Sequence, residues 1–432
     1  MVKNFKRNVL IFPGGTEIGL EIWNALKECK EINLYSAGSD VSNHAPFVFK
    51  NHYIVPDINA EGWIEALNKI LNKLAIDYIF PAYDDIILAL ASNSERIPAN
   101  IISSPLSTCL LTRSKRKTYT KFKGLIPVPK TYNKIEEINS FPVFVKPDKG
   151  QGSQNSFKIS DPELLKVLLK NNHDYIISEY LNGKEYTVDC FTDRNKGLLF
   201  CGGRERIRTK NGISMDSKPV DRELHHIFHR YAQIISRELE IYGAWFFQLK
   251  LDALKEFKLL EIAPRVSGTM AMNRIFGINF PLLSIYEKEG IDLSIMVNNY
   301  SAHIDRALIN RYEHNINYKN VYVDLDDTLI LDDQINTQLI KFLYQAVNEN
   351  CRLILITKTV NDIKDTFKKW RLEGLFDQIL LLEKGDSKAD YIDPHESIFI
   401  DDSFSERRSV YNKHQIPTFD CSMIELLINW KH

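Results

Sequence analysis

Cysteine is scarce in this sequence and forms no pattern. The 432 residues include six cysteines, and no two of them make a Cys-x-x-Cys pair. Scattered cysteines of this kind are expected to be reduced thiols of a cytoplasmic protein. They are Cys29, Cys109, Cys190, Cys201, Cys351 and Cys421.

The sequence also lacks a charge excess and a long hydrophobic run. Lys+Arg number 55 against 56 Asp+Glu, which argues against nucleic acid or a membrane surface as a partner bound through bulk charge. The first residues, MVKNFKRNVLIFPGG, are basic, but their apolar run covers only Val9 to Phe12, too short for a signal peptide. No run approaches the ~20 apolar residues of a membrane span. We therefore expect a cytoplasmic protein without a membrane span.

What the chain does have is length and clear strand–helix patterning. Its 432 residues exceed one ordinary core, so two or three domains are expected. Residues 1–105 alternate apolar strands such as NVLIF with amphipathic helices, which predicts an α/β domain with a parallel sheet. Residues 106–305 hold long strands joined by short turns, which predicts an α+β domain with an antiparallel sheet. Residues 306–318 are the predicted linker, and residues 319–432 return to strand–helix alternation, typical of a doubly wound parallel sheet.

Acidic residues follow an apolar strand in VYVDLDDTLI, residues 321–330. Asp324 and Asp326 stand two apart, so both face one pocket if Leu325 points away. Ligands gather at the carboxyl ends of parallel strands, and later strands of this domain also end on polar residues. These strand-end residues are Thr357, Asp401 and Asp402.

A group of carboxylates is tolerable around a hard cation such as Mg²⁺. A lysine just before the last strand, Lys388 or Lys384, offsets the remaining negative charge and holds a phosphate oxygen. The order DLDDT, the Thr of LILIT, a Lys and IDD resembles the haloacid-dehalogenase (HAD) phosphohydrolase superfamily. The alternative is a charged loop, or a scaffold of this fold without turnover.

The HAD resemblance implies specific roles. Asp324 is the nucleophile that forms an aspartyl-phosphate, and Asp326 is the general acid/base. Thr357 and Lys388 bind the phosphate. The implied Mg²⁺ ligands are Asp324, Asp326, Asp401 and Asp402. The motif spacing leaves little room for a cap domain, so we expect an uncapped, open site that suits a large or tethered phosphoester.

A lysine and a glycine-containing loop stand together in FPVFVKPDKGQGSQ. Glycines let backbone N–H groups approach phosphates, and the lysine supplies a fixed charge. The predicted phosphate ligands here are Lys146, Gly150, Gly152 and Ser153. Glu179 and Glu185 follow in SEYLNGKEYTVD and suit a ribose and an adenine edge.

Further polar residues join Lys146 and the glycine-containing loop in a second candidate site. Gln248 lies in FFQLKLD, and Glu261 and Arg265 lie in LLEIAPRVSG. Alternation along a strand puts 261, 263 and 265 on one face, so these groups converge on a triphosphate and Mg²⁺. In order, the motifs over residues 1–300 resemble the ATP-grasp superfamily, closest to the carbamoyl-phosphate-synthase-like and carboxylate–amine ligase branch.

The ATP-grasp resemblance implies that ATP and Mg²⁺ are cofactors. Lys115 of SKRKTY matches a phosphate-side lysine, Gln248 and Glu261 are the metal ligands, and Arg265 is catalytic. Where the family writes Glu-x-Asn-Pro-Arg, this chain has Ala263, which has no oxygen to offer a metal. Together the two resemblances imply a pre-ATP-grasp α/β domain, an ATP-grasp fold and a HAD-like Rossmannoid sheet without a large cap.

The expected function is an ADP-forming ligase that joins a small-molecule carboxylic acid to an amine through an acyl-phosphate. The fused phosphatase is expected to act on a related phosphorylated metabolite. Similar enzymes often form homodimers. The alternatives are an ATP-dependent phosphotransferase acting on a small molecule, or a nucleotide-binding scaffold with an inactive HAD module.

Some charged residues leave two interpretations open. Arg204, Arg206 and Arg208 alternate in GRERIR, and either grip an anionic substrate or are exposed charge on an edge strand. Asp84 and Asp85 end a strand beside PGGTEIG, and either orient an amine or hydroxyl group or are helix N-caps.

Overall fold

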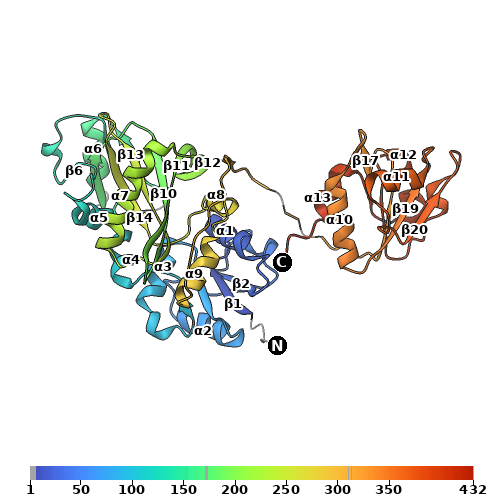
Figure 1. The fold of residues 1–432 in the computed structure, drawn as a ribbon, viewed down its shortest axis with the longest axis horizontal. Coiled ribbons are helices and arrows are strands. Elements are labelled where there is room, and N and C mark those ends of the chain that lie inside the picture. The colour runs from blue at the N-terminus through green and yellow to red at the C-terminus, as the bar shows by residue number, and fades with distance from the viewer. Residues whose placement is uncertain are drawn as a thin grey trace. The chain divides into compact units, whose positions relative to one another are not determined.

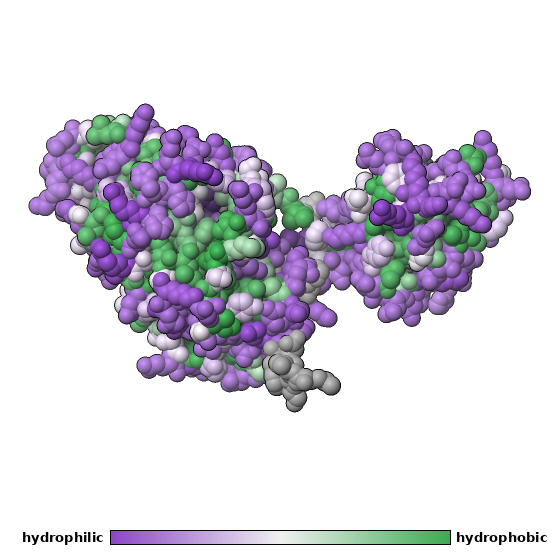
Figure 2. Space-filling model, in the orientation of Figure 1, coloured by the Kyte–Doolittle hydropathy of each residue, from purple (hydrophilic) through white to green (hydrophobic). Residues whose placement is uncertain are grey.

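The computed structural model describes residues 6–150, 152, 154–170, 174–309, 311–312 and 314–431. The chain divides into two compact units, Met1–Leu308 and Ile309–Lys431. The division lies inside the predicted linker, residues 306–318. Figure 1 traces both units, and Figure 2 shows that the drawn surface of each is mostly hydrophilic, broken by smaller hydrophobic areas.

The first unit begins with a parallel sheet, as predicted. Its five strands lie in the order β3-β2-β1-β4-β5. They are β1 (Arg7–Phe12), β2 (Ile32–Gly38), β3 (His52–Ile54), β4 (Tyr78–Pro81) and β5 (Asn100–Ile101). The end of β1 and all of β4 are buried, because helices cover both faces of a parallel sheet. The helices are α1 (Glu17–Leu26), η1 (Ala45–Phe47), α2 (Trp63–Lys73), α3 (Asp84–Ser92) and η2 (Ser94–Arg96).

A four-stranded antiparallel sheet follows, in the order β6-β9-β7-β8. Its strands are β6 (Thr131–Tyr132), β7 (Val143–Pro147), β8 (Phe157–Ile159) and β9 (Tyr175–Glu179). The accompanying helices are α4 (Leu106–Arg113), α5 (Lys115–Phe122), η3 (Ile135–Glu137) and α6 (Pro162–Lys170). Val143, Val145 and Ile177 point into a small core of this sheet, which leaves residue 146 on the opposite face.

The largest sheet has six strands in the order β14-β13-β10-β11-β12-β15. They are β10 (Glu185–Asp193), β11 (Gly197–Lys210), β12 (Ile213–Pro219), β13 (Gly243–Leu251), β14 (Phe257–Ala263) and β15 (Ile304–Asp305). Its helices are α7 (Arg222–Glu238), α8 (Ala271–Ile275) and α9 (Phe280–Lys288). Phe228 and Ile235 of α7 pack on Val188 and Trp245, so one face of this sheet is core (Figure 1).

Two sequence predictions about this sheet need correction. Strand β11 lies between β10 and β12, so the edge-strand interpretation of Arg204 and Arg206 is wrong, and both side chains are buried. Arg208 near the end of β11 is exposed and pairs with Asp305. Strand β14 ends at Ala263, before Pro264, so strand alternation does not orient Arg265.

The second unit contains a parallel sheet in the order β20-β19-β16-β21-β22. Its strands are β16 (Asn320–Val323), β19 (Arg352–Thr357), β20 (Gln378–Leu381), β21 (Ser397–Ile400) and β22 (Thr418–Phe419). The two short strands β17 (Ile330–Leu331) and β18 (Gln334–Ile335) form a separate hairpin. The helices are α10 (Thr337–Asn348), α11 (Ile363–Trp370), η4 (Lys388–Asp390), α12 (Phe404–His414), η5 (Cys421–Met423) and α13 (Ile424–Leu427).

Alternation along these strands builds a hydrophobic core on each face of the sheet. Val321 and Val323 pack with Phe342 of α10 on one face. Tyr322 packs with Val410 of α12 on the other face. Among the described residues, no helix is long and apolar enough to cross a bilayer.

Replacing Phe342 by alanine is expected to destabilise the second unit alone. Phe342 is fully buried in that unit's core, and deleting such a side chain typically costs about 3–5 kcal/mol. In calorimetry we expect one unfolding transition to move to lower temperature while the other stays. Tyr344→Ala, at an exposed position of the same helix, is the control. A shift of both transitions would contradict two separately folded units.

Candidate functional site

A row of polar side chains crosses four strands of the six-stranded sheet, on the face opposite α7. Arg204 on β11 is in register with Thr187 on β10, and Thr187 is in register with Gln248 on β13. Gln248 is in turn paired with Glu261 on β14. Cross-strand partners in a sheet point to the same side, so these four residues line one surface. Strand pairing thus brings together Gln248 and Glu261, which were predicted to be metal ligands, and Arg204, which was considered as a group that grips an anionic substrate.

A cavity of about 140 Å³ lies between this surface and the four-stranded sheet. One part of its wall is apolar and includes Phe144, Tyr180 and Leu260. The polar part includes six of the residues predicted to bind a nucleotide or metal: Lys115, Lys146, Glu179, Glu185, Gln248 and Glu261. A wall that combines apolar and aromatic side chains with charged ones fits a ligand that combines an aromatic ring with phosphates.

Lys146 is a buried cation of this cavity. Its Nζ donates a hydrogen bond to the Tyr119 hydroxyl at 2.8 Å, which has no formal charge. Burial lowers the pKa of Lys146 to about 8, although the Glu261 and Glu185 carboxylates act in the opposite direction. Burial also lowers the pKa of Lys115, whose Nζ donates to the Gly150 carbonyl at 3.0 Å. Tyr119 was missed by the sequence analysis, although it stands in the quoted SKRKTY.

Glu185 and Gln248 are both engaged by Arg206. The Arg206 Nη1 donates to Glu185 Oε1 at 2.5 Å and to Gln248 Oε1 at 2.7 Å. Glu179 is engaged elsewhere, because its Oε1 accepts from the Lys130 backbone N–H at 2.8 Å. In the part of the chain that the structure describes, the Glu261 carboxylate has no hydrogen-bond donor. Glu261 is therefore the acidic group of this cavity that is open to a ligand.

A second, larger cavity of about 360 Å³ adjoins the first. The two cavities share wall residues, among them Arg206, Gln248 and Glu261. Arg265 lines the second cavity, and its Nε is ion-paired with Asp84 in the first turn of α3. The N-cap of α3 is Tyr83, so the N-cap interpretation of Asp84 and Asp85 is wrong. Asp85 forms an ion pair with Arg113.

The glycine loop is described only in part. Gly150 lines the first cavity, and Gly152 lines both cavities with a positive φ of 61° that glycine adopts without strain. Ser153 lies outside the described residues. Ala263 is buried next to Glu261 in a small adjoining cavity and offers no oxygen there.

In the second unit, the predicted strand-end residues meet at one edge of the parallel sheet. Asp324 follows β16 and Asp401 follows β21, and these strands pair in register at Val323 and Ile400. The carboxylates of Asp324, Asp401 and Asp402 have oxygens that all lie within 4.8 Å of one another. Thr357 ends the neighbouring strand β19 and is buried.

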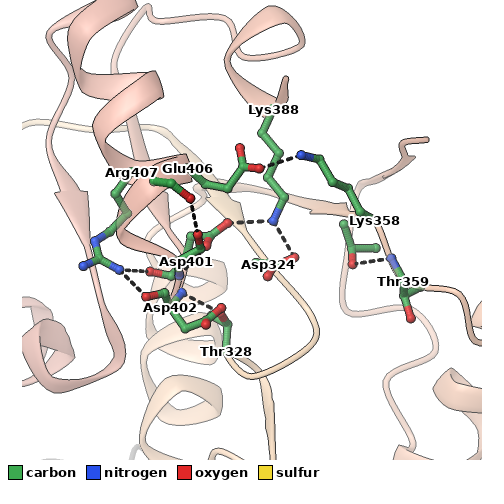
Figure 3. A network of polar contacts seen from close by, with 12 residues as sticks. Asp324, Thr328, Lys358, Thr359, Lys388, Asp401, Asp402, Glu406 and Arg407 are labelled. Carbon is green, nitrogen blue, oxygen red and sulfur yellow. Dashed lines mark hydrogen bonds and ion pairs between the residues drawn. The ribbon is translucent and has the colours of Figure 1, made fainter. Parts of the chain in front are cut away.

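Lys388 lies between two of these carboxylates, as Figure 3 shows. Its Nζ is 2.7 Å from Asp324 Oδ1 and 2.6 Å from Asp401 Oδ2. The structure thus brings Lys388 to the acids, whereas Lys384 is exposed. Asp326 is half-buried and is not part of the close carboxylate group.

Two groups that the sequence analysis did not single out hold the acidic loop. The Thr328 hydroxyl bonds to Asp402 Oδ1 at 3.1 Å and accepts from the Asp402 backbone N–H at 2.9 Å (Figure 3). Arg407 Nη1 donates to the carbonyls of Asp401 and Asp402, at 2.6 Å each. Thr328 is the threonine of DLDDT, so the motif itself carried that signal.

The charges of this group do not balance. Three carboxylates lie together, and one ammonium contacts two of them. Burial raises the pKa of Asp324 to about 6 despite its contact with Lys388. Burial raises the pKa of Asp401 as well. Burial would lower the pKa of Lys388, but the two carboxylates raise it overall. A divalent cation would supply the missing positive charge, and carboxylate oxygens are ligands that Mg²⁺ accepts.

Comparison with known proteins bears on the first unit. Residues 9–103 match a family model described as PylC-like, N-terminal domain. Residues 171–308 match a model described as ATP-grasp in the biosynthetic pathway with Ter operon. A D-alanine–D-alanine ligase of Fusobacterium nucleatum subsp. nucleatum is 31% identical over 93 residues, which are 22% of this chain and 32% of that protein. The chain thus spans about a third of this relative's length.

Solved structures resemble the same part of the fold. Biotin carboxylase from Campylobacter jejuni, in a β-γ-ATP complex, superposes with a TM-score of 0.56 and 17% identity over 67% of this chain and 72% of that chain. N5-Carboxyaminoimidazole synthetase from Staphylococcus aureus, complexed with ADP, has a TM-score of 0.56 and 17% identity over 68% of this chain and 80% of that chain. The predicted resemblance to ATP-grasp enzymes is therefore confirmed at the level of the fold: the first unit of this chain has the ATP-grasp fold.

Proposed function

We propose that the first unit is an ADP-forming ligase that binds ATP in the smaller cavity and a carboxylic acid in the larger one. The observation that supports this most directly is the shared wall of the two cavities, which includes Arg206, Gln248 and Glu261. A γ-phosphate held at this wall faces the second cavity. The carboxylic acid therefore meets the γ-phosphate close to the open carboxylate of Glu261 and to the buried cations Lys146 and Lys115.

The fit to ATP follows from the two kinds of side chain that line the smaller cavity. The apolar and aromatic side chains Phe144, Tyr180 and Leu260 take the adenine ring. The cations Lys146 and Lys115 take the phosphates, which neutralise their charge. Gly150 and Gly152 leave room for backbone N–H groups beside them.

The reaction proceeds by transfer of the γ-phosphoryl group. An oxygen of the acid's carboxylate attacks the γ-phosphorus, and the bond to the bridging oxygen breaks, so ADP leaves and an acyl-phosphate forms. Lys146 and Arg265 stabilise the negative charge that spreads over the phosphoryl oxygens. The nitrogen of an amine then attacks the acyl carbon and phosphate leaves, which gives an amide.

The residues present fit a Mg²⁺ ion only in part. Glu261 offers an open carboxylate, while the Gln248 oxygen already accepts a bond from Arg206 and Ala263 contributes nothing. When bound with ATP, Mg²⁺ neutralises phosphate charge. Glu261 is thus the chain's main anchor for a metal here, and the phosphates supply further oxygens.

We propose a HAD-type phosphatase for the second unit. An oxygen of Asp324 attacks the phosphorus of a phosphoester, and the departing alcohol takes a proton from Asp326. Lys388 holds Asp324 in place, and Lys388 and Thr357 bind the phosphate oxygens. Water then hydrolyses the aspartyl-phosphate, with Asp326 as the base.

The donor set of the second unit fits Mg²⁺ better than that of the first. Asp324, Asp401 and Asp402 provide three clustered carboxylates with one ammonium to offset them. Bound there, Mg²⁺ offsets the charge of the incoming phosphate. The substrate of this site is a phosphorylated relative of the acid or product of the first site, an idea that rests on the fusion of the two units.

The proposed ligase is tested by ³¹P NMR with Mg²⁺-ATP and pooled carboxylic acids and amines. We expect ADP and phosphate only when an acid and an amine are both present, and no ADP from Glu261→Gln, because its carboxylate is replaced by a neutral amide. A new stable phosphoester formed without an amine would instead indicate a phosphotransferase. No turnover of ATP with any pool would contradict the ligase and favour a nucleotide-binding scaffold.

Asp324→Asn is expected to abolish hydrolysis of a phosphoester and to stabilise the second unit at neutral pH. The pKa of Asp324 is raised to about 6 in the folded protein from 3.8, so the folded state binds the extra proton and stability falls as pH rises through this window. A neutral amide removes that cost, which is up to about 3 kcal/mol at pH 7 and vanishes below pH 4. Denaturant unfolding in metal-free buffer measures the difference.

The same comparison tests the metal. Mg²⁺ should stabilise the wild-type second unit against denaturant and have a smaller effect on Asp324→Asn, which has lost one ligand charge. Asp365→Asn, in the first turn of α11, is a matched control for the loss of an aspartate. Equal stabilisation of all three proteins by Mg²⁺ would contradict a site at Asp324.

Binding of Mg²⁺-ATP is expected to weaken above pH 8. Because burial lowers the pKa of free Lys146 to about 8, the ammonium that meets the phosphates is lost above that pH. The dissociation constant should rise about fivefold between pH 8 and pH 9. Lys146→Arg should bind with little change over this range, and Lys149→Gln, at an exposed position, should behave as wild type. A flat wild-type profile would contradict phosphate binding by Lys146.

A further inference from the structure

The larger cavity contains a guanidinium group that has no use in the proposed phosphoryl transfer. Arg306 directly follows β15, and its backbone N–H donates to the Met215 carbonyl of β12 at 2.8 Å. This contact fixes the residue at the margin of the sheet, and its side chain lines the cavity. Within the described residues, the guanidinium makes no hydrogen bond, and its Nη1 is buried without a partner.

The chain leaves room for the Arg306 side chain at one position. A Cβ added to Gly268 would lie 3.1 Å from Arg306 Nη1, closer than most Cβ contacts. The φ angle of Gly268 is not positive, so the backbone does not require glycine there. The absence of a side chain at Gly268 instead leaves space for the Arg306 guanidinium. Burial lowers the pKa of Arg306, since the group has left water without gaining a bonded anion.

Arg204 faces the same cavity with a second unpartnered nitrogen. It is almost fully buried, with a relative exposure of 1%. Its Nε donates to Asp189 at 2.7 Å, and its Nη2 donates to Asp189 at 3.2 Å and to Ser267 at 3.0 Å. Its Nη1 is buried and has no partner in the described structure. A buried, unmade hydrogen bond of a charged group is costly, so a ligand oxygen is expected near it.

Most of the acidic groups near this pair are already engaged or exposed. Glu21 is buried and bonded to Arg274 at 3.0 Å, and Asp84 is paired with Arg265. Asp189 accepts from Arg204 and also from Asn273 at 2.8 Å. Glu17 lines the cavity but is exposed. Glu261 also lines the cavity and is open to a ligand. The wall nevertheless holds more cationic than acidic side chains, namely Arg204, Arg206, Arg265 and Arg306 against Glu17, Asp84 and Glu261.

We propose that the acid taken by this cavity carries a second anionic group, a carboxylate or a phosphate, which binds between Arg306 and Arg204. Its first carboxylate then lies toward Glu261 and Arg265, where the two cavities meet. The assignment of a reacting carboxylate rests on the proposed ligase function. The binding of a dianion does not, because it depends only on the two guanidinium groups.

The test is equilibrium binding to the full chain by calorimetry, without nucleotide, using acids in matched pairs. Glutarate is compared with butyrate, and phosphoglycerate with glycerate, so that each pair differs by one anionic group. In at least one pair, we expect the acid with the second anionic group to bind at least about tenfold more tightly than its partner, as charge-assisted hydrogen bonds imply. A preference for glutarate identifies a dicarboxylic acid, and a preference for phosphoglycerate identifies a phosphorylated acid.

Three variants localise the site. Arg306→Gln should remove the preference for the dianion, Arg306→Lys should restore part of it, and Gly268→Ala should weaken it by displacing the guanidinium. Arg208→Gln is the matched control, because Arg208 is an exposed arginine that pairs with Asp305, the residue before Arg306. It should bind as wild type.

The outcomes separate this inference from the ligase itself. Equal affinity for both members of each pair, or a preference that survives Arg306→Gln, would overturn the dianion site. Turnover of ATP with a monocarboxylic acid that is insensitive to Arg306→Gln would overturn it too. A dianion preference that depends on Arg306 in a protein that never turns over ATP would overturn the ligase and support the anion site.

Discussion

Burying a charged group is costly unless an opposite charge lies beside it, and this constraint explains the arrangement of charged residues in both units. The buried ion pair of Arg204 with Asp189 supplies such a counter-charge, although the Arg204 Nη1 still has no partner among the described residues. Where it is incomplete, the residue is available for a ligand. Lys146 has only a tyrosine hydroxyl, and Arg306 has no partner among the described residues. The acid cluster of the second unit has the opposite deficit, with three carboxylates and only Lys388 paired with two of them.

The two units therefore present complementary chemistry. The walls of the two cavities of the first unit hold more cationic than acidic side chains and suit anions such as phosphates and carboxylates. The second unit carries surplus negative charge and suits a cation that can in turn bind a phosphate. Both arrangements depend on a β-sheet. Polar residues lie at one face or edge of the sheet, while the alternate residues of the same strands pack into a hydrophobic core.

Strand pairing explains why the first site is precise. Arg204, Thr187, Gln248 and Glu261 come from four strands, and hydrogen-bonded register aligns them into one row. The opposite face of these strands packs on α7, so a slip of one residue would turn the row into the core. Burial of Val188, Trp245 and Phe247 thus holds the polar row in place.

The amino-acid sequence was enough to predict the parallel sheet of the first unit and the antiparallel character of the middle strands. It was also enough to single out Lys146, Glu261, Asp324 and Asp401 as candidate site residues. These follow from apolar periodicity and from short motifs, which are local properties of the chain. Which charged side chains pair with each other became clear only from the folded chain. Pairing between distant strands brings Arg206 to Glu185 and Gln248. It also places Arg306 in the wall of the larger cavity. Local patterning cannot specify such contacts, because register and packing arise between residues far apart in the chain.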